Sequence, residues 1–167
     1  MKCTFVTRPS AALGLATLVL FFVCAQCPAQ YTPSTGPGSA YSIPQPQLIQ
    51  PGELVHMLQA TGTGKPLLLQ VGSHLLFDEA HIPGSVYAGP GSQPAGLQLL
   101  QSTVASLSKS KFIVLYCGCC PWDRCPNLGP AFKQMRDLGF SNVKVLYIAN
   151  NLGTDWVAKG YPVERSH

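Results

Sequence analysis

Four cysteines lie within nine residues of each other, and they are the side chains in this sequence best suited to covalent chemistry. They are Cys117, Cys119, Cys120 and Cys125, with Arg124 just before the last of them. A thiolate is a nucleophile, a metal ligand and a redox group, and a nearby cation favours it over the neutral thiol. The cluster therefore predicts sulfur, thiol-redox or metal chemistry.

The segment supports several chemistries. In a sulfur relay, Cys117 accepts a sulfur atom as a persulfide, and Cys119, Cys120 or Cys125 resolves it into a disulfide. Neighbouring thiols also suit redox exchange. The four thiolates are alternatively ligands for a soft metal such as copper(I) or zinc, although their spacing does not repeat the paired two-residue gaps of usual zinc sites. Our main expectation is that no metal or cofactor is bound.

A purely structural role for these cysteines is a further alternative. A disulfide from Cys119 or Cys120 to Cys125 would tie the segment together. Closing so short a loop stabilises the fold by about 2 to 3 kcal/mol in the chain-entropy account. Such a disulfide would leave Cys117 free to react.

The elements that position the cysteines follow from an alternation of strand and helix patterns. Short apolar runs predict buried strands at 67–71, 112–116 and 142–148. Apolar residues at helical spacing predict helices at 51–58, 97–107 and 128–138. The alternation predicts an α/β fold with a mostly parallel central sheet and helices on both faces. Cys117 then follows a strand, at the carboxyl edge where such sheets bind ligands.

Several segments are similar to the rhodanese family. Residues 78–85 (DEAHIPGS) resemble its acidic, His-Ile-Pro-Gly-small segment, and the strand that ends at Cys117 follows at the expected place. Leu138-Gly139-Phe140 and the ending 156–164 continue the pattern, so the resemblance covers about residues 49 to 164.

The resemblance implies a rhodanese-like fold and, in active members, a strand-end cysteine that accepts a sulfane sulfur and passes it on. Cys117 is the matching residue, and Arg124 could stabilise the anion with the backbone N–H groups of the loop. The helix that follows would favour the thiolate. His81 matches a scaffold position and is expected to hold its turn through hydrogen bonds.

The cysteine loop also departs from the family pattern. Active members usually have four residues between the cysteine and an arginine that opens the next helix, whereas six separate Cys117 from Arg124. Cys119 and Arg124 do show the four-residue gap, which makes Cys119 the alternative nucleophile. Counting backward from the helix end places the family's arginine near Asn127 and its cysteine near Trp122. The loop is therefore expected to be enlarged.

A second departure lies at the end of the strand 67–71. The family commonly has an Asp-x-Arg pair there, whereas this chain has Gln70-Val71-Gly72. The ion pairs that usually support the site should be missing. These changes keep the scaffold and alter the site.

The first thirty residues follow the plan of a secretory signal peptide. Lys2 and Arg8 are basic, and the apolar run 11–25 is shorter than the about 20 residues that a membrane span needs. Small residues suit cleavage after Ala29. We therefore expect a signal peptide at 1–29, a tether rich in Pro, Gly and Ser at 30–50 and a rhodanese-like domain at 51–167, in the periplasm or secreted.

Charge and composition limit the kinds of binding partner that the sequence predicts. Without Lys2 and Arg8, nine basic residues face seven acidic ones, so nothing predicts binding to nucleic acid or to an anionic surface. The expected partners are a small sulfur donor and a thiol acceptor, including a protein thiol, with no stable membrane insertion after cleavage. The predicted function is an exported sulfurtransferase or persulfide carrier. The alternative is a non-catalytic binding module whose loop is disulfide-tied or metal-binding.

Overall fold

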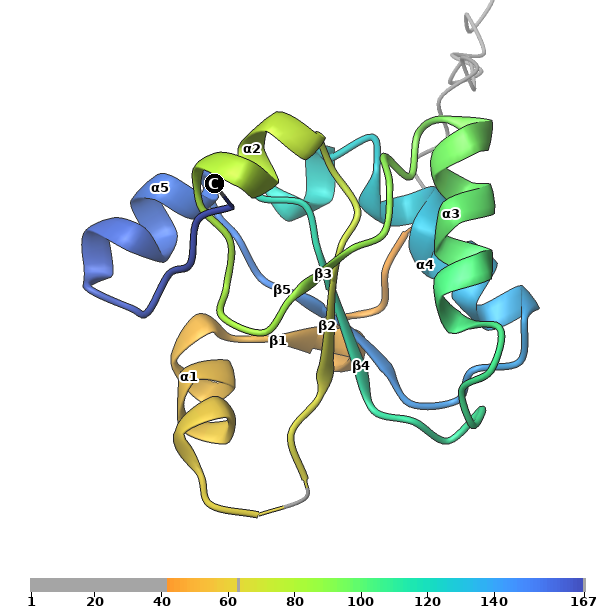
Figure 1. The fold of residues 1–167 in the computed structure, drawn as a ribbon, viewed down its shortest axis with the longest axis horizontal. Helices are drawn as coiled ribbons and strands as arrows, with labels where there is room; N and C mark the ends of the chain where they lie inside the picture. Colours follow the sequence, from red (N-terminus) through yellow and green to blue (C-terminus); the bar gives the residue numbers. More distant parts are fainter. Residues whose placement is uncertain (1–41, 63, 167) are drawn as a thin grey trace, which may run out of the picture. The chain divides into compact units, whose positions relative to one another are not determined.

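A five-stranded sheet forms the centre of the fold (Figure 1). The computed structural model describes residues 42–62 and 64–166, so the predicted signal peptide and about half of the predicted tether lie outside the described residues. All strand pairs are parallel, and the strand order is β1-β5-β4-β2-β3. The strands are β1 (Leu48–Ile49), β2 (Leu67–Gln70), β3 (Val86–Tyr87), β4 (Ile113–Tyr116) and β5 (Val143–Leu146).

Helices cover both faces of this sheet. The α-helices are α1 (Pro51–Gln59), α2 (His74–Glu79), α3 (Pro94–Val104), α4 (Leu128–Asp137) and α5 (Leu152–Asp155). Short 3-10 helices are η1 (Gln45–Gln47), η2 (Trp122–Arg124) and η3 (Val157–Lys159). In Figure 1, α3 and α4 lie on one side of the sheet and α1 and α5 on the other. Proline at the first position of α1 and of α3 suits a helix start, because that N–H has no partner within the helix.

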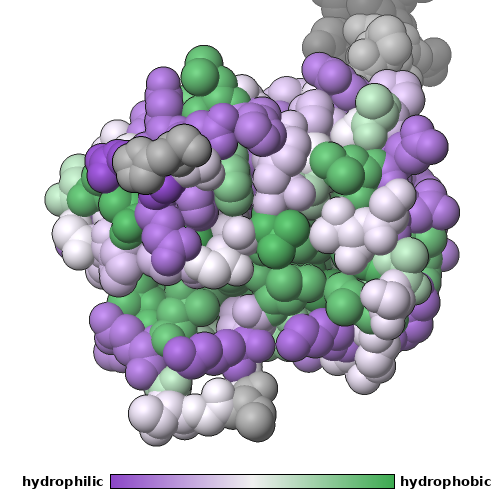
Figure 2. All heavy atoms as spheres, in the orientation of Figure 1, coloured by the Kyte–Doolittle hydropathy of each residue, from purple (hydrophilic) through white to green (hydrophobic). Residues whose placement is uncertain are grey.

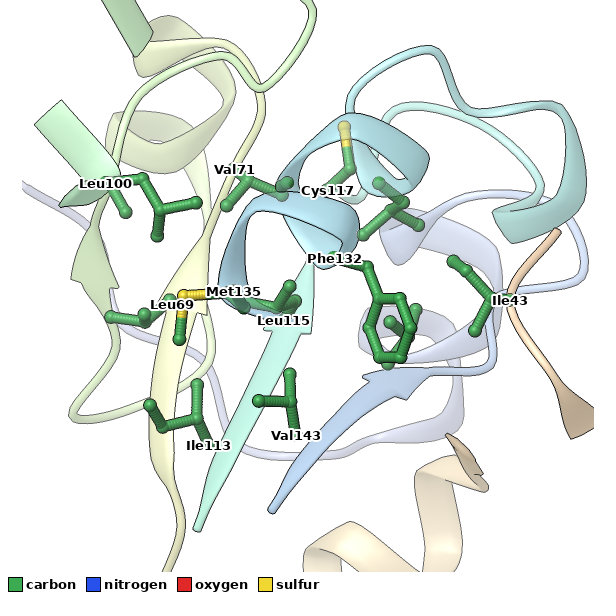
Figure 3. Packing of buried hydrophobic residues seen from close by; sticks show 14 of the residues in the cluster. Ile43, Leu69, Val71, Leu100, Ile113, Leu115, Cys117, Phe132, Met135 and Val143 are labelled. Carbon is green, nitrogen blue, oxygen red and sulfur yellow. The ribbon is translucent and has the colours of Figure 1, made fainter. Parts of the chain in front are cut away.

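The apolar runs form strands because both sides of each strand are buried. Along β4, Ile113 and Leu115 pack in one core cluster, whereas Val114 and Tyr116 pack in the other. Figure 3 shows Met135 and Phe132 of α4 over the first of these faces. Successive side chains of a strand point to opposite faces, so a strand covered on both faces reads as a continuous apolar run. The predicted α/β fold with a parallel sheet and helices on both faces is confirmed.

The observed bounds of helices and strands differ from the predicted ones where the periodic pattern in the sequence is short or weak. Helix α3 begins at Pro94 and ends at Val104, and Leu107 packs against the core beyond its end. The edge strands β1 and β3 have two residues each, which is too short for any periodic pattern to show. The short helices α2 and α5 were not predicted for the same reason.

The surface is mixed in character. Figure 2 shows hydrophobic surface across the middle of one face with hydrophilic side chains around it. Among the described residues, the large hydrophobic side chains that remain exposed are Leu75, Val86 and Leu99. None of the helices in the described part of the chain has both the length and the apolar character that crossing a membrane requires.

The segment Ile82–Ser85, with His81 before it, forms what we call the 81–85 turn, and Glu164 near the end of the chain fixes it. The two residues form an antiparallel bridge: His81 N donates to Glu164 O at 2.9 Å, and Glu164 N donates to His81 O at 2.8 Å. The buried His81 ring stacks on Phe77, with its Nδ1 2.7 Å from the Phe77 carbonyl oxygen. These contacts agree with the scaffold role predicted for His81.

The phenol of Tyr116 connects the same turn to the central strand. Its hydroxyl donates to Ser85 Oγ at 3.0 Å and accepts from Ile82 N at 3.2 Å. Tyr116 is fully buried, and burial raises its pKa to about 12. The neutral phenol therefore remains a hydrogen-bond donor throughout the physiological pH range.

Candidate functional site

Cys117 lies where the central strand ends. Strands β2 and β5 pair with β4 on its two sides, so the strand and its terminal residue are held firmly. Gly118 then turns the chain with a φ of +89°, a region that favours glycine, and its carbonyl accepts from Leu152 N at 2.9 Å. In Figure 3 the Cys117 sulfur points away from the strand residues beneath it.

The predicted cysteines come together in three dimensions. Cys117 Sγ lies 3.2 Å from Cys119 Sγ, which lies 3.0 Å from Cys120 Sγ. The Sγ atoms of Cys117, Cys119 and Cys125 all lie within 4.8 Å of one another. Cys117 and Cys125 are buried, Cys120 is partly buried and Cys119 is exposed. All four are free thiols, so neither disulfide considered from the sequence, Cys119 or Cys120 with Cys125, is formed in this structure.

Asn127 is the residue that sequence reasoning did not assign to the site. Its side-chain amide Nδ2 donates to Cys117 Sγ at 3.3 Å, and its Oδ1 accepts from Ser92 N at 3.0 Å. The second bond fixes the orientation of the amide. Asn127 precedes α4 as its N-cap residue. The signal was present, because backward counting aligned Asn127 with the family's arginine position.

The end of β2 supports Cys117 through neutral hydrogen bonds. Gln70 Nε2 donates to the Cys117 carbonyl at 3.0 Å, and Gln70 Oε1 accepts from Gly72 N at 3.1 Å. A Cβ at Gly72 would lie only 2.7 Å from Cys117 Sγ. None of the ion pairs found among the described residues involves residues 70–72. Gln70 thus takes the supporting place of the ion pairs that are usual in the family, and Gly72 leaves room for the thiol.

The Arg124 side chain makes no hydrogen bond to the thiols. It is exposed in η2, and among the described residues its guanidinium makes no hydrogen bond or ion pair. The structure therefore supplies an amide from Asn127, rather than this cation, as the polar partner of Cys117. A role for Arg124 in stabilising an anion stays a prediction.

The surroundings of the thiols favour their neutral form. A hydrogen bond with Cys125, together with burial, raises the pKa of Cys117 far above the ordinary thiol value. Burial raises the pKa of Cys119 and raises that of Cys120 to about 12. We expected the strand end and the helix start to favour the Cys117 thiolate. That expectation was wrong for the loop with its four free thiols. Burial and the neighbouring thiols raise the pKa of Cys117 more than the backbone N–H donors lower it.

A cleft of about 320 Å³ opens onto two of the four sulfurs. Cys117 and Cys119 line it, whereas Cys120 and Cys125 are not among its lining residues. Glu79 is the charged residue among the described lining residues, and no lysine or arginine joins it. The remaining lining residues are Gln70, Leu76, Ala80, Gly118, Asn151, Leu152, Gly153 and Val157.

Trp122 covers the loop rather than the cleft. Its backbone N–H donates to the Ile148 carbonyl at 2.8 Å, and its ring lies 6.2 Å from that of Tyr147. The side chain packs against the core cluster that contains Cys117 and Cys125. Trp122 thus anchors the cysteine loop to the segment after β5.

Comparison with known proteins identifies one family. The family model described as "Rhodanese-like domain" matches residues 51–147, more than half of the chain. No curated protein sequence matches the chain significantly.

Solved structures share the fold at low sequence identity. A Bacillus halodurans protein has 24% identity and a TM-score of 0.55, over 71% of this chain and 76% of its own. The rhodanese-like domain of an Anabaena protein has 21% identity and a TM-score of 0.53, over 71% of this chain and 79% of its own. A thiosulfate sulfurtransferase from Pseudomonas aeruginosa has 22% identity and a TM-score of 0.53, over 72% of this chain but only 19% of its own.

Proposed function

Because this chain belongs to the rhodanese-like domain family, we propose that it is a sulfurtransferase or persulfide carrier that uses a loop cysteine as its nucleophile. One observation supports this most directly. Two thiols, Cys117 and Cys119, lie 3.2 Å apart at the carboxyl end of the central strand and line the same cleft. That edge of a parallel sheet is where ligands bind in α/β folds.

The first step is sulfur transfer to Cys117, the residue that matches the family's acceptor cysteine. Its sulfur attacks the outer sulfur of a donor persulfide, and the bond between the two donor sulfurs breaks. The departing donor sulfur takes the proton of Cys117, so the products are the Cys117 persulfide and the donor thiol. No external oxidant or reductant is required. The Asn127 amide, 3.3 Å from Cys117 Sγ, stabilises negative charge that develops there.

The second step moves the sulfur outward to Cys119. Cys117 is only 2% exposed, whereas Cys119 is exposed at the cleft. Attack of the Cys119 sulfur on the outer persulfide sulfur regenerates the Cys117 thiol and produces a Cys119 persulfide. An acceptor thiol then reaches the sulfur without entering the core. A protein thiol fits this role, because the exposed cysteine needs no deep pocket.

The charge of the cleft limits which class of sulfur donor fits the site. Among the described residues, its lining includes Glu79 and no basic residue, so a dianion such as thiosulfate gains no ion pair from them. A thiol persulfide or a short polysulfide of low charge fits better. This preference follows from the cleft and from the exposed position of Arg124.

The N-terminal pattern supports a location for this chemistry. We propose that residues 1–29 direct export, that residues 30–50 form a tether, and that the domain acts in the periplasm or outside the cell. The support is the basic start and the short apolar run. Peptide sequencing of the cell-associated and released protein tests it, with Gln30 expected as the new first residue.

Intact mass spectrometry of the chain treated with a small thiol persulfide tests the proposed reaction. We expect the added mass of one sulfur, mapped by peptide fragmentation to Cys117 or Cys119. Cys117→Ser should abolish loading, and Cys119→Ser should load but transfer poorly to a protein thiol. Loading of Cys117→Ser together with an inactive Cys119→Ser would make Cys119 the nucleophile. Absence of added sulfur on all four reduced cysteines would instead support a non-catalytic binding module.

A further inference from the structure

We propose that Cys117, Cys119 and Cys125 form a three-thiolate site for one soft, closed-shell cation, represented by Cu(I). Their three Sγ atoms lie within 4.8 Å of one another, and Cys117 and Cys119 are already 3.2 Å apart. Sulfur ligands about 2.3 Å from a shared ion lie at most about 4.6 Å from each other, and about 4 Å apart in a trigonal arrangement. Small side-chain adjustments therefore suffice to enclose an ion.

The donor set favours a soft cation over a hard one. Within the described part of the chain, no carboxylate or imidazole joins the three sulfurs in this group. Thiolate ligands select Cu(I), zinc and iron–sulfur centres, whereas magnesium and calcium require oxygen ligands. Structural zinc sites are almost always four-coordinate. Cys120 lies outside the group of three, and a three-sulfur set suits Cu(I) best.

The loop combines two buried thiols with one thiol that is exposed at the cleft. Cys117 and Cys125 are 2% and 6% exposed, whereas Cys119 is exposed at the cleft. An ion can therefore be captured by Cys119 and transferred to the two buried sulfurs. Asn127, held by Ser92 N, directs its amide hydrogen at Cys117 Sγ. Such an outer partner orients a ligand and tunes the metal.

Binding is balanced by proton release. One Cu(I) and three thiols give a tris-thiolate complex of charge −2 and three protons. Copper is not oxidised or reduced, so no electron donor or acceptor takes part. The inference does not rest on the proposed sulfur transfer. It implies that a bound ion occupies both cleft thiols and that metal binding and sulfur loading exclude each other.

The test uses the full chain with Cys3, Cys24 and Cys27 replaced by serine, so that only the loop thiols remain. Cu(I) alone is added under anaerobic, reducing conditions without any sulfur donor, in competition with a chromophoric Cu(I) chelator. We expect one equivalent to bind, with ultraviolet thiolate-to-copper absorption and release of about three protons at neutral pH. Sulfur loading is measured separately on metal-free protein, so the two proposals can fail independently.

Two variants and a footprint locate the ligands. Cys125→Ser should weaken Cu(I) binding at least 100-fold, whereas the matched variant Cys120→Ser should bind within threefold of the parent. Bound Cu(I) should protect three cysteines from alkylation and leave Cys120 reactive. Trypsin cuts after Arg124, so Cys125 is quantified on a peptide separate from the other three. The footprint on the unsubstituted loop keeps the test valid even if Cys125→Ser fails to fold.

Three results would overturn the inference. The first is Cu(I) binding in the parent that is no tighter than to a Cys117→Ser, Cys119→Ser double variant. The second is protection of Cys120 along with the other three. The third is a Zn(II) complex that displaces Cu(I) and needs Cys120, which would establish a four-thiolate site.

Discussion

Two irregular segments adjoin strand β4, the 81–85 turn through Tyr116 and the loop 117–127 through Cys117, and they are held in opposite ways. The 81–85 turn is fixed by the paired backbones of His81 and Glu164 and by the Tyr116 hydroxyl. The loop 117–127 contains free thiols whose contacts are weak sulfur hydrogen bonds. Its firm attachments are at Gly118, Trp122 and Asn127.

This difference separates the scaffold from the chemistry. The 81–85 turn matches the family pattern, and its polar groups are used to hold the fold. The loop departs from that pattern, and its thiols face one another and a cleft. Changes in the turn should therefore alter stability with little effect on sulfur chemistry, whereas changes in the loop should do the reverse.

The largest expected effect is the loss of the loop nucleophile. Cys117→Ser should reduce persulfide loading at least 1000-fold, because a hydroxyl does not form a persulfide. The free energy of unfolding should change by only about 1 kcal/mol, because serine is close in size to cysteine. Mass spectrometry and urea denaturation measure the two effects. A large loss of stability without loss of loading would break the comparison.

A change at Gly72 should affect both stability and sulfur loading, since this residue belongs to the scaffold but lies beside the Cys117 thiol. In Gly72→Ala the new Cβ would lie 2.7 Å from Cys117 Sγ, so the sulfur must move. We expect loading to fall about tenfold, with a loss of about 1 to 3 kcal/mol in unfolding free energy. Gly64→Ala is the matched control, because a Cβ there meets nothing within 4 Å. Equal rates in both variants would contradict the proposed geometry.

The turn itself is tested by Tyr116→Phe. Removing the hydroxyl leaves the buried Ile82 N–H without its partner, which should destabilise the fold by about 1 to 3 kcal/mol. Sulfur loading of the folded protein should stay within twofold. Thermal denaturation and loading rates at a temperature well below unfolding check the two claims. Slower loading with unchanged stability would show that the turn and the loop are coupled.

The pH dependence of thiol alkylation sharpens the electrostatic side of the comparison. Because the pKa values of Cys117, Cys119 and Cys120 are raised, with that of Cys120 at about 12, these three thiols are neutral at pH 8. Alkylation of these three thiols should be slower than that of free cysteine, and for Cys120 it should still rise tenfold per pH unit above pH 9, where free cysteine levels off. The same chain in denaturant, with serine at the three N-terminal cysteines, should regain ordinary rates. A plateau below pH 8 would contradict these shifts.

The smallest expected effect concerns Glu79 at the cleft. Glu79→Gln should raise the rate with thiosulfate two- to threefold and leave the rate with a neutral persulfide donor unchanged, because Glu79 is exposed and its field is screened. Glu53→Gln in α1 serves as the control for loss of one negative charge. An unchanged thiosulfate rate would remove the argument that the cleft charge selects the donor.

The fold was predictable because its central strands are formed by long apolar runs that are visible in the sequence. The runs of β2, β4 and β5 and the amphipathic α1 and α4 were recognisable, and the position of Cys117 followed from the end of one such run. The strands β1 and β3 were not predicted, because two residues show no period. The partner of Cys117 was not predicted either. Because the spacing between Cys117 and Arg124 departs from the family pattern, spacing alone does not tell whether Arg124 or Asn127 faces the thiol.

The parallel sheet also affects how the chain folds. Leu48 pairs with Val145 across most of the domain, and none of the strands in the described part of the chain has a hairpin partner. Ordering such distant contacts is slow because long loops must close first. During that time the loop thiols are accessible to oxidants. Neighbouring cysteines can then form disulfides that are absent from the folded structure before the sheet forms. Refolding should therefore be faster and more complete with a reductant than with an oxidant.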